Sequence, residues 1–196
     1  MIDINPNTQN QQTIKKSISI SGIGLHSGKQ VKMKLVPGEV DYGVKFIRSD
    51  KKNNNVIDAI WSNVSETILS TTISNKSDLK ISTIEHLMSA LSGLHIDNLA
   101  IYINASEVPI MDGSSKPFVD LIESVGIKVQ NKKRKLISVK KSIEVKNGNS
   151  SAKIIPNNQF SIDFEIDFPS KLVSKQSCQL QLINGNYKSD IAAART

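Results

Sequence analysis

Between residues 160 and 168 the sequence alternates strictly between apolar and polar residues. The apolar positions are Phe160, Ile162, Phe164, Ile166 and Phe168, and the positions between them are Ser161, Asp163, Glu165 and Asp167. A period of two places every second side chain on the same side of a β-strand. The segment is therefore predicted to be a strand with one buried face, and the fold must supply something that covers that face.

The sequence around this strand predicts further strands but no helix to cover them. Strands are expected at residues 136–145, 152–155 and 179–183, and Asn147-Gly148 is a typical hairpin signal between the first two. A small sheet whose apolar face is bare is not stable alone. Residues 131–196 are therefore predicted to be the first strands of an incomplete second domain.

The preceding part of the chain mixes strands with two amphipathic helices. Strands are expected at residues 13–23, 31–36, 44–48 and 99–104. One helix is predicted from a cap at Ser82 to Gly93, and a second from Ser115 to Gly126. This order predicts an α+β domain at residues 13–130, after a disordered or frayed N-terminus at residues 1–12.

Charge and cysteine content narrow the class of protein. The net charge is +7, but the densest basic run, residues 132–135, lacks the clustered arginines or stacking aromatics of a nucleic-acid patch. We interpret it as a solvated linker and expect no nucleic-acid partner. The single cysteine, Cys178, excludes an intramolecular disulfide and fits a reducing compartment. With no secretory signal or apolar run of about 20 residues, a cytoplasmic location is expected.

The three histidines are the first candidates for chemistry. A catalytic zinc site needs three protein ligands and one open position. Glu85 and His86 are adjacent in the first turn of a predicted helix, so one could take a proton from water while the other binds a metal. Alternatively, Glu85 only completes a capping box with Ser82. His26 lies in a glycine-rich loop, where it could contact a ligand or only a carbonyl, and His95 reads as a surface residue of a turn.

Five segments, taken together, indicate a protein family more specifically than any one of them does. Taken in order, they resemble the UDP-3-O-acyl-N-acetylglucosamine deacetylases, the zinc amidases of lipid A biosynthesis in Gram-negative bacteria, and the resemblance extends from about residue 13 to residue 196. The segments are residues 22–28 (GIGLHSG), 81–87 (ISTIEHL), 97–98 (DN), 108–118 (VPIMDGSSKPF) and 194–196 (ART).

The resemblance implies a fold and a set of site residues. It implies two α+β domains of β-sheets, with helices packed between the sheets and the active site in the cleft. His86 corresponds to a zinc ligand, Glu85 to the general base that activates water, and Thr196 to the threonine that stabilises the oxyanion. Substrate contacts are implied for His26, Leu69, Ser70 and Phe168. Phe168 would approach the uracil, although packing in a core is an equal alternative for this last residue of its strand.

The same resemblance also predicts what this sequence lacks. The other two zinc ligands of the family, together with its active-site lysine and a further histidine, lie downstream of the Ala-Arg-Thr motif. No histidine follows His95 here. We therefore expect the chain to be the N-terminal portion of a Zn²⁺-dependent deacetylase, inactive alone.

As a full-length protein it is expected to be a monomer that removes the N-acetyl group of UDP-3-O-(3-hydroxyacyl)-N-acetylglucosamine. Because this substrate is amphiphilic and no anchor is seen, any membrane contact is expected to be peripheral. The alternative is a non-catalytic, truncated binding or assembly module.

Overall fold

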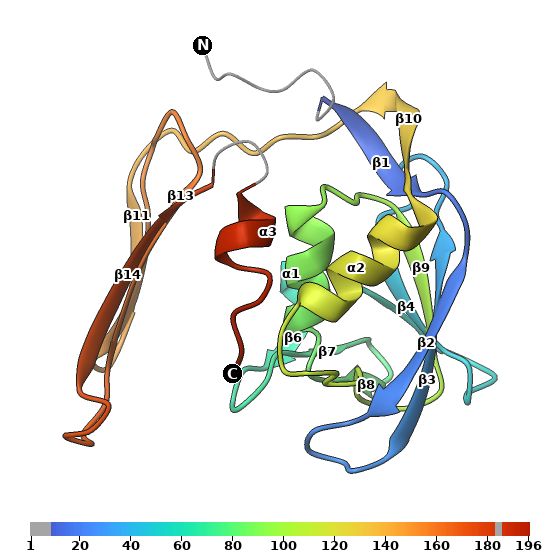
Figure 1. Cartoon of the computed structure of the whole chain (residues 1–196), viewed down its shortest axis with the longest axis horizontal. Coiled ribbons are helices and arrows are strands. Elements are labelled where there is room, and N and C mark those ends of the chain that lie inside the picture. The colour runs from blue at the N-terminus through green and yellow to red at the C-terminus, as the bar shows by residue number, and fades with distance from the viewer. Residues whose placement is uncertain (1–8, 183–185) are drawn as a thin grey trace. The chain divides into compact units, whose positions relative to one another are not determined.

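The computed structural model of this chain describes residues 9–182 and 186–196, which form two compact units (Figure 1). The larger unit comprises the described residues up to Arg134 together with Lys188–Thr196. The smaller unit comprises the described residues from Lys135 to Tyr187. The larger unit contains strands and a few helices, and the smaller unit consists mainly of strands, so the predicted α+β class is confirmed.

A five-stranded sheet forms the framework of the larger unit. Its strands run in the order β2 (Ile18–Ile23), β3 (Gln30–Pro37), β9 (Leu99–Ile103), β4 (Val44–Arg48) and β5 (Val56–Asp58). Only β4 and β9 pair in parallel; the other neighbours are antiparallel. The alternation in β3 is the reason that one face of the sheet is apolar, because Val31, Met33 and Leu35 are all buried there.

Two helices lie on one face of this sheet (Figure 1). They are α1 (Glu85–Gly93) and α2 (Lys116–Val125), which pack against each other. Each buries an apolar stripe, with Leu87 and Leu91 on α1 and Phe118 and Ile122 on α2. Gly126, at φ 77°, ends α2 as predicted. No helix among the described residues is both long and apolar enough to cross a membrane.

The remaining strands of the larger unit form two small sheets. One joins β6 (Val64–Glu66), β7 (Thr72–Ser74) and β8 (Lys80–Ile81), and a 3₁₀ turn at Trp61–Asn63 precedes it. The other pairs β1 (Asn10–Ile14) with β10 (Ile127–Lys133). The single strand predicted at residues 13–23 is therefore two strands, β1 and β2. The predicted frayed start falls partly on residues 1–8, which lie outside the described residues, while residues 10–12 belong to β1.

The interpretation of the basic run as a solvated linker is wrong for its first three residues. Lys132 and Lys133 end strand β10, and the larger unit runs to Arg134. The Nζ of Lys132 contacts the carboxylate of Asp41, and Nε of Arg134 donates to Oδ1 of Asp97 over 2.8 Å. Because these acidic partners lie far away in the sequence, the local composition gave no sign of them.

A buried polar network connects the β1–β10 pair to the five-stranded sheet. Nδ2 of Asn98 donates to Oε1 of Gln11 and of Gln130 over 2.8 and 2.7 Å. The Thr13 hydroxyl donates to the Asn98 carbonyl over 2.6 Å and accepts from the N–H of Gly38 over 3.1 Å. Nε2 of Gln130 donates to the carbonyl of Gly38 over 2.9 Å. Gly38 therefore lies at the centre of this connection.

Replacing Gly38 with alanine is expected to reduce the free energy of unfolding by about 3 kcal/mol. An added Cβ would lie 2.8 Å from main-chain atoms of both Asn98 and Leu99, which cannot move without disturbing the network. The control is Gly43→Ala, where nothing lies within 4 Å and only the φ of 72° opposes the change, so a loss of about 1 kcal/mol is expected. Urea unfolding measures both; equal losses would contradict the steric argument.

The smaller unit consists of two hairpins. Strand β11 (Ile143–Asn147) pairs with β12 (Ser150–Ile154), and Gly148, at φ 57°, sits in the turn, which confirms the predicted hairpin. Strand β13 (Ser161–Asp167) pairs with β14 (Lys175–Gln181). A short helix, α3 (Tyr187–Asp190), begins at the last residue of this unit, and its other residues belong to the larger unit.

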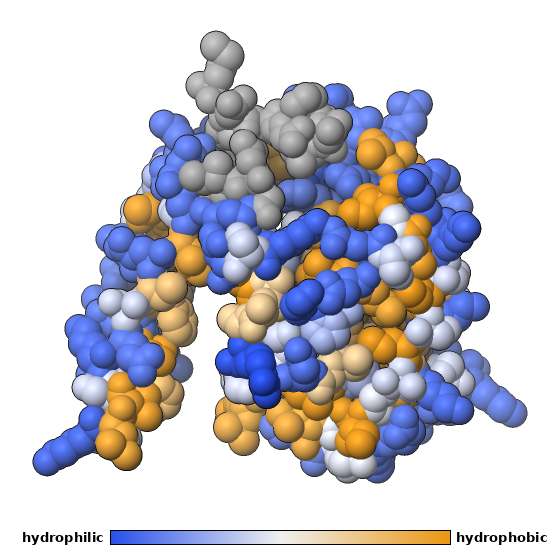
Figure 2. All heavy atoms as spheres, in the orientation of Figure 1, coloured by the Kyte–Doolittle hydropathy of each residue, from blue (hydrophilic) through white to orange (hydrophobic). Residues whose placement is uncertain are grey.

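The alternating segment is the strand that its pattern predicts, but its apolar face is not buried. Phe160 and Phe164 are 66% and 58% exposed, and hydrophobic atoms are visible on the surface of this unit in Figure 2. The face stays exposed because the described part of this unit has no helix long enough to cover it, as the sequence indicates.

Candidate active site

The glycine-rich loop is a tight turn between β2 and β3 that presents His26 to solvent. The N–H of Gly28 donates to the carbonyl of Gly24 over 2.9 Å. The N–H of Gly24 donates to the carbonyl of Lys29 over 3.0 Å. The N–H groups of His26 and Ser27 each donate to the carboxylate of Glu107 over 2.9 Å. The His26 side chain is exposed while its backbone is anchored.

Glu85 and His86 are the first two residues of α1 and are half-buried. The capping-box alternative for Glu85 is wrong. The Ser82 hydroxyl donates instead to the Ser106 carbonyl over 3.3 Å, and Oε2 of Glu85 accepts from the N–H of Thr71 over 3.0 Å. A capping box needs the acidic residue at the third helical position, whereas α1 begins at Glu85 itself. Its carboxylate therefore sits at the positive end of the helix dipole, where negative charge is favoured.

Leu69 and Ser70 lie in the loop between β6 and β7, directly before the residue that binds Glu85. The Leu69 side chain is 85% exposed, and its backbone has a φ of 61°. The carbonyl of Thr71 accepts from the N–H of Ile84 over 3.4 Å, so this loop lies along the start of α1. An exposed leucine in a strained backbone gains nothing for stability, and such positions cluster at functional sites.

Thr196 lies against the segment that joins β9 to α2. Its N–H donates to the carbonyl of Gly113 over 3.1 Å, and the Ser115 hydroxyl donates to the carbonyl of Ala192 over 3.0 Å. Asp112 beside them accepts from both the hydroxyl and the N–H of Ser114, which hold the pKa of its carboxyl below the usual value. The carboxylate of Asp112 therefore stays ionised and fixes the turn that Thr196 contacts.

Hydrogen bonds connect all of these segments. From Thr196 the connection runs through Gly113 to Ile110, whose N–H donates to the carbonyl of Ile23 over 3.0 Å at the start of the glycine-rich loop. From that loop it continues through Glu107 to Thr83, two residues before Glu85. In the larger unit, the segments that carry His26, Glu85, His86 and Thr196 are therefore linked by hydrogen bonds, and the loop of Leu69 and Ser70 is linked to Glu85 through Thr71.

Phe168 is the one predicted site residue in the smaller unit. It follows β13, and its side chain is 51% exposed. Its N–H donates to the carbonyl of Ser174 over 3.3 Å. The alternative that Phe168 packs in a core is therefore not seen among the described residues, and its contact with a uracil stays a prediction.

The described residues do not form a metal site by themselves. Among the described residues, no group of three His, Cys, Asp or Glu side chains is close enough to hold a metal ion. A zinc site needs three such ligands, so His86 would be one of a set that the described residues do not complete. His95 is an exposed residue in the turn after α1, as predicted.

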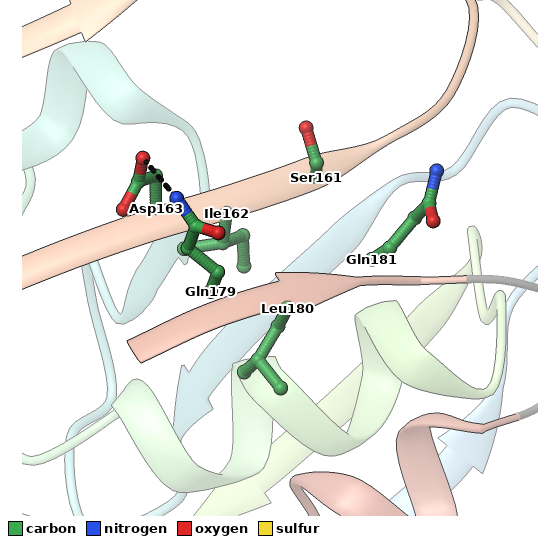
Figure 3. Close-up of a pocket in the computed structure, with 6 residues that line it drawn as sticks. All are labelled: Ser161, Ile162, Asp163, Gln179, Leu180 and Gln181. Atoms are coloured by element: carbon green, nitrogen blue, oxygen red, sulfur yellow. Dashed lines mark hydrogen bonds between the residues drawn. The ribbon is translucent and has the colours of Figure 1, made fainter. Parts of the chain in front are cut away.

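A shallow hollow on the smaller unit is unrelated to these segments. It has a volume of about 300 Å³ and lies on the β13–β14 hairpin (Figure 3). Its polar side chains include Asp163 and Gln179, which share a hydrogen bond of 3.1 Å across the two strands. None of the predicted site residues lines it, and an open depression on a two-stranded ribbon offers no converging catalytic groups.

Two residues of the site went unnoticed in the sequence. Glu107 is 2% exposed and Thr83 has a φ of 57°, yet neither belongs to a familiar catalytic pattern. The only local sign was an acidic residue just before the apolar Val108-Pro109-Ile110, in a position where a charge is rarely buried without partners.

Comparisons with known proteins agree with this set of segments. The family model described as UDP-3-O-acyl N-acetylglycosamine deacetylase matches residues 11–196. A protein of Syntrophus aciditrophicus (strain SB), named UDP-3-O-acyl-N-acetylglucosamine deacetylase, is 41% identical over 186 residues, or 95% of this chain and 59% of that protein. Proteins of the same name from Pseudoalteromonas atlantica and Syntrophotalea carbinolica are 42% and 43% identical, again over 95% of this chain, and are covered to 62% and 60%.

The chain thus spans about three-fifths of the length of the curated relatives that it matches. The family model nevertheless covers nearly all of the chain, including every segment of the connected site. The chain therefore belongs to the UDP-3-O-acyl N-acetylglycosamine deacetylase family.

Proposed function

We propose that this chain is the N-terminal portion of an enzyme that hydrolyses the N-acetyl group of UDP-3-O-(3-hydroxyacyl)-N-acetylglucosamine in lipid A biosynthesis. The products are acetate and the free 2-amino sugar nucleotide. The observation that carries the proposal is the hydrogen-bonded connection from Thr196 through the glycine-rich loop to Thr83, two residues before Glu85. The printed names of the relatives supply the substrate class.

Glu85 is proposed as the general base. Its Oε2 is held by the N–H of Thr71, which leaves Oε1 as the oxygen to take a proton from the attacking water. The carboxylate is half-buried, so it is shielded from bulk water and can still be reached by a substrate. The same proton can then be passed to the departing amine.

Thr196 is proposed to donate its hydroxyl hydrogen to the oxyanion that forms when water attacks the acetamide carbonyl. One well-placed donor of this kind contributes on the order of 3 kcal/mol to stabilising the transition state. The backbone of Thr196 is fixed on Gly113, which supports a defined position for its side chain. His26, Leu69, Ser70 and Phe168 are proposed to contact the substrate.

Zinc is proposed as the cofactor, with His86 as one ligand. Because the described residues hold no group of three ligands, the other ligands are proposed to come from sequence beyond Thr196. The chain alone is accordingly proposed to be inactive, and the full-length enzyme to be a cytoplasmic monomer with at most peripheral membrane contact.

The test compares the full-length protein with the chain of residues 1–196. Each is incubated with the acylated UDP-N-acetylglucosamine, and acetate and the free amine are measured. The full-length protein should release both, lose the activity after chelation and regain it with Zn²⁺, while the short chain should stay inactive. If a zinc-loaded, folded full-length protein binds the nucleotide sugar but releases no acetate, the non-catalytic binding module replaces this proposal.

A further inference from the structure

Glu107 is a buried carboxylate that joins two parts of the candidate site. The residue is 2% exposed. Its Oε1 accepts from the N–H of His26 over 2.9 Å and from the Thr83 hydroxyl over 3.1 Å, and its Oε2 accepts from the N–H of Ser27 over 2.9 Å. A single side chain therefore holds both the loop that carries His26 and the segment that leads into Glu85 and His86.

The backbone of Glu107 is fixed next to the same segment. Ser82 and Glu107 form a parallel bridge, in which the N–H of Ser82 donates to the Ser106 carbonyl over 2.9 Å and the N–H of Val108 donates to the Ser82 carbonyl over 3.1 Å. The carboxylate therefore extends from a rigid base. It has little freedom to follow the glycine-rich loop if that loop moves.

Thr83 is held in a conformation that threonine avoids. Its φ of 57° lies in the left-handed region, which is strained for a β-branched residue. Such strain persists only where the surroundings enforce it, and it concentrates at functional sites. Here the hydroxyl of Thr83 is bound to Glu107, and Thr83 is separated from Glu85 only by Ile84. The direction in which the chain enters α1 thus depends on this bond.

The glycine-rich loop is shaped to enclose the same carboxylate. A Cβ on Gly24 would lie 2.4 Å from Oε2 of Glu107 and 2.4 Å from the Ser27 hydroxyl oxygen. Only glycine lets the loop turn closely around these atoms. Gly24 is therefore required for the close approach of the loop to Glu107.

The surroundings of Glu107 stabilise the ionised form of its carboxyl group. Burial by itself would raise the pKa of its carboxyl, but the hydrogen bonds from His26, Ser27 and Thr83 outweigh burial and hold the pKa below its ordinary value. The group is therefore ionised at neutral pH and accepts from all of its donors at once.

We propose that Glu107 is a positioning residue for the deacetylation, which sets the distance between the His26 loop and the Glu85–His86 pair. It touches neither substrate nor reacting atoms; it acts through the backbone of the loop and through Thr83. The proposal rests on the proposed function, since it assigns a role within that reaction. Its geometric part, the coupling of the loop to the start of α1, can be measured without any activity.

The first test is Glu107→Gln in the full-length enzyme. The amide keeps the shape, but its NH₂ group must face one of the donors that the carboxylate bound. Because a displacement of about 1 Å in a site can cost about 100-fold, kcat is expected to fall tenfold to 100-fold. KM is expected to rise as well, since His26 is among the proposed substrate contacts. The matched control, Glu39→Gln, changes an exposed carboxylate and should leave both constants unchanged.

The second test separates positioning from plain stability. Thr83→Val keeps the β-branched shape, the charge of Glu107 and its bonds to the loop, and removes only the link to α1. If Glu107 positions the site, this variant also loses kcat, and the amides of His26 and Ser27 exchange hydrogen faster, although neither residue was changed. In Glu107→Gln the exchange of these amides should rise by about tenfold.

Several outcomes would overturn the proposal. One is a Glu107→Gln enzyme that unfolds at a lower temperature but retains its kcat. If Glu107→Gln does not fold, Thr83→Val decides alone, and unchanged kcat with unchanged exchange at residues 26–27 refutes the coupling. If the wild-type enzyme itself shows no deacetylation, the proposed function fails, and the exchange measurement still determines whether the loop and α1 are coupled through Glu107.

Discussion

Replacing Glu85 with glutamine is expected to lower kcat for deacetylation by about 10²–10⁴-fold in the full-length enzyme. The carbonyl oxygen of the amide can still accept from the N–H of Thr71, so the start of α1 should keep its geometry. The amide cannot take a proton from water, however, and the attacking nucleophile is then not activated. Because binding does not depend on this proton transfer, KM should change little. Initial rates over a range of substrate concentrations measure both constants.

The comparison needs a folded variant and a matched control. The circular dichroism spectrum of Glu85→Gln should equal that of the wild type, and its unfolding midpoint should fall only slightly, because the variant loses the negative charge that the dipole of α1 favours. Glu39→Gln, the same change on an exposed residue, should retain full activity. A Glu85→Gln enzyme with kcat within a few-fold of the wild type would show that another group accepts the proton, and the assignment of the base would be wrong.

The sequence predicted the strands and helices with a regular apolar stripe, but not the short or polar strands. Apolar periodicity placed β3, β4, β9, β13 and both longer helices correctly, because each buries or presents one regular stripe of side chains. It did not predict β5, β6, β7, β8 or β10. It also missed the break between β1 and β2 and the true start of α1. Both depend on pairings far along the chain, β1 with β10 and Ser82 with Glu107, which a local pattern cannot contain.

In the candidate site too, features set by neighbouring residues could be predicted from the sequence, and features set by distant contacts could not. The adjacency of Glu85 and His86 at a helix start was visible locally, but it left a catalytic pair and a capping box as alternatives. The structure removes the capping box because the helix begins at Glu85 and its carboxylate binds Thr71. Glu107 could not be predicted, because its role consists of contacts to residues about 80 and 24 positions away.

The Asp97-Asn98 pair shows that a segment shared with a family of enzymes can serve the fold alone. Oδ2 of Asp97 accepts from the N–H of Gln12 over 2.8 Å, and its Oδ1 accepts from Arg134. The Asn98 side chain is buried in the network around Gly38 and also accepts from the N–H of Gly43 over 2.8 Å. Both residues attach β1 and β10 to the five-stranded sheet, so their contribution to activity would be indirect.

Asn98→Leu is therefore expected to reduce the free energy of unfolding by about 3–5 kcal/mol. Leucine has nearly the same shape as asparagine, so the loss is not one of volume. It leaves Oε1 of the buried Gln130 and the N–H of the half-buried Gly43 without the partner that Asn98 gave them, and a buried group in that state costs about 1–3 kcal/mol. The loss of the hydrogen bond from Asn98 costs less at Gln11, because Oε1 of Gln11 also accepts from the N–H of Asp41 over 2.9 Å. Urea unfolding followed by circular dichroism measures the change.

The matched control for this change is Asn131→Leu. Asn131 lies next to Gln130 in β10 but is exposed, so the same substitution there should alter the free energy of unfolding by less than about 0.5 kcal/mol. If Asn98→Leu were as harmless as Asn131→Leu, the network would not be what holds β1 and β10 to the sheet. The Asp97-Asn98 segment would then need another explanation, and a direct role in catalysis would be the first to examine.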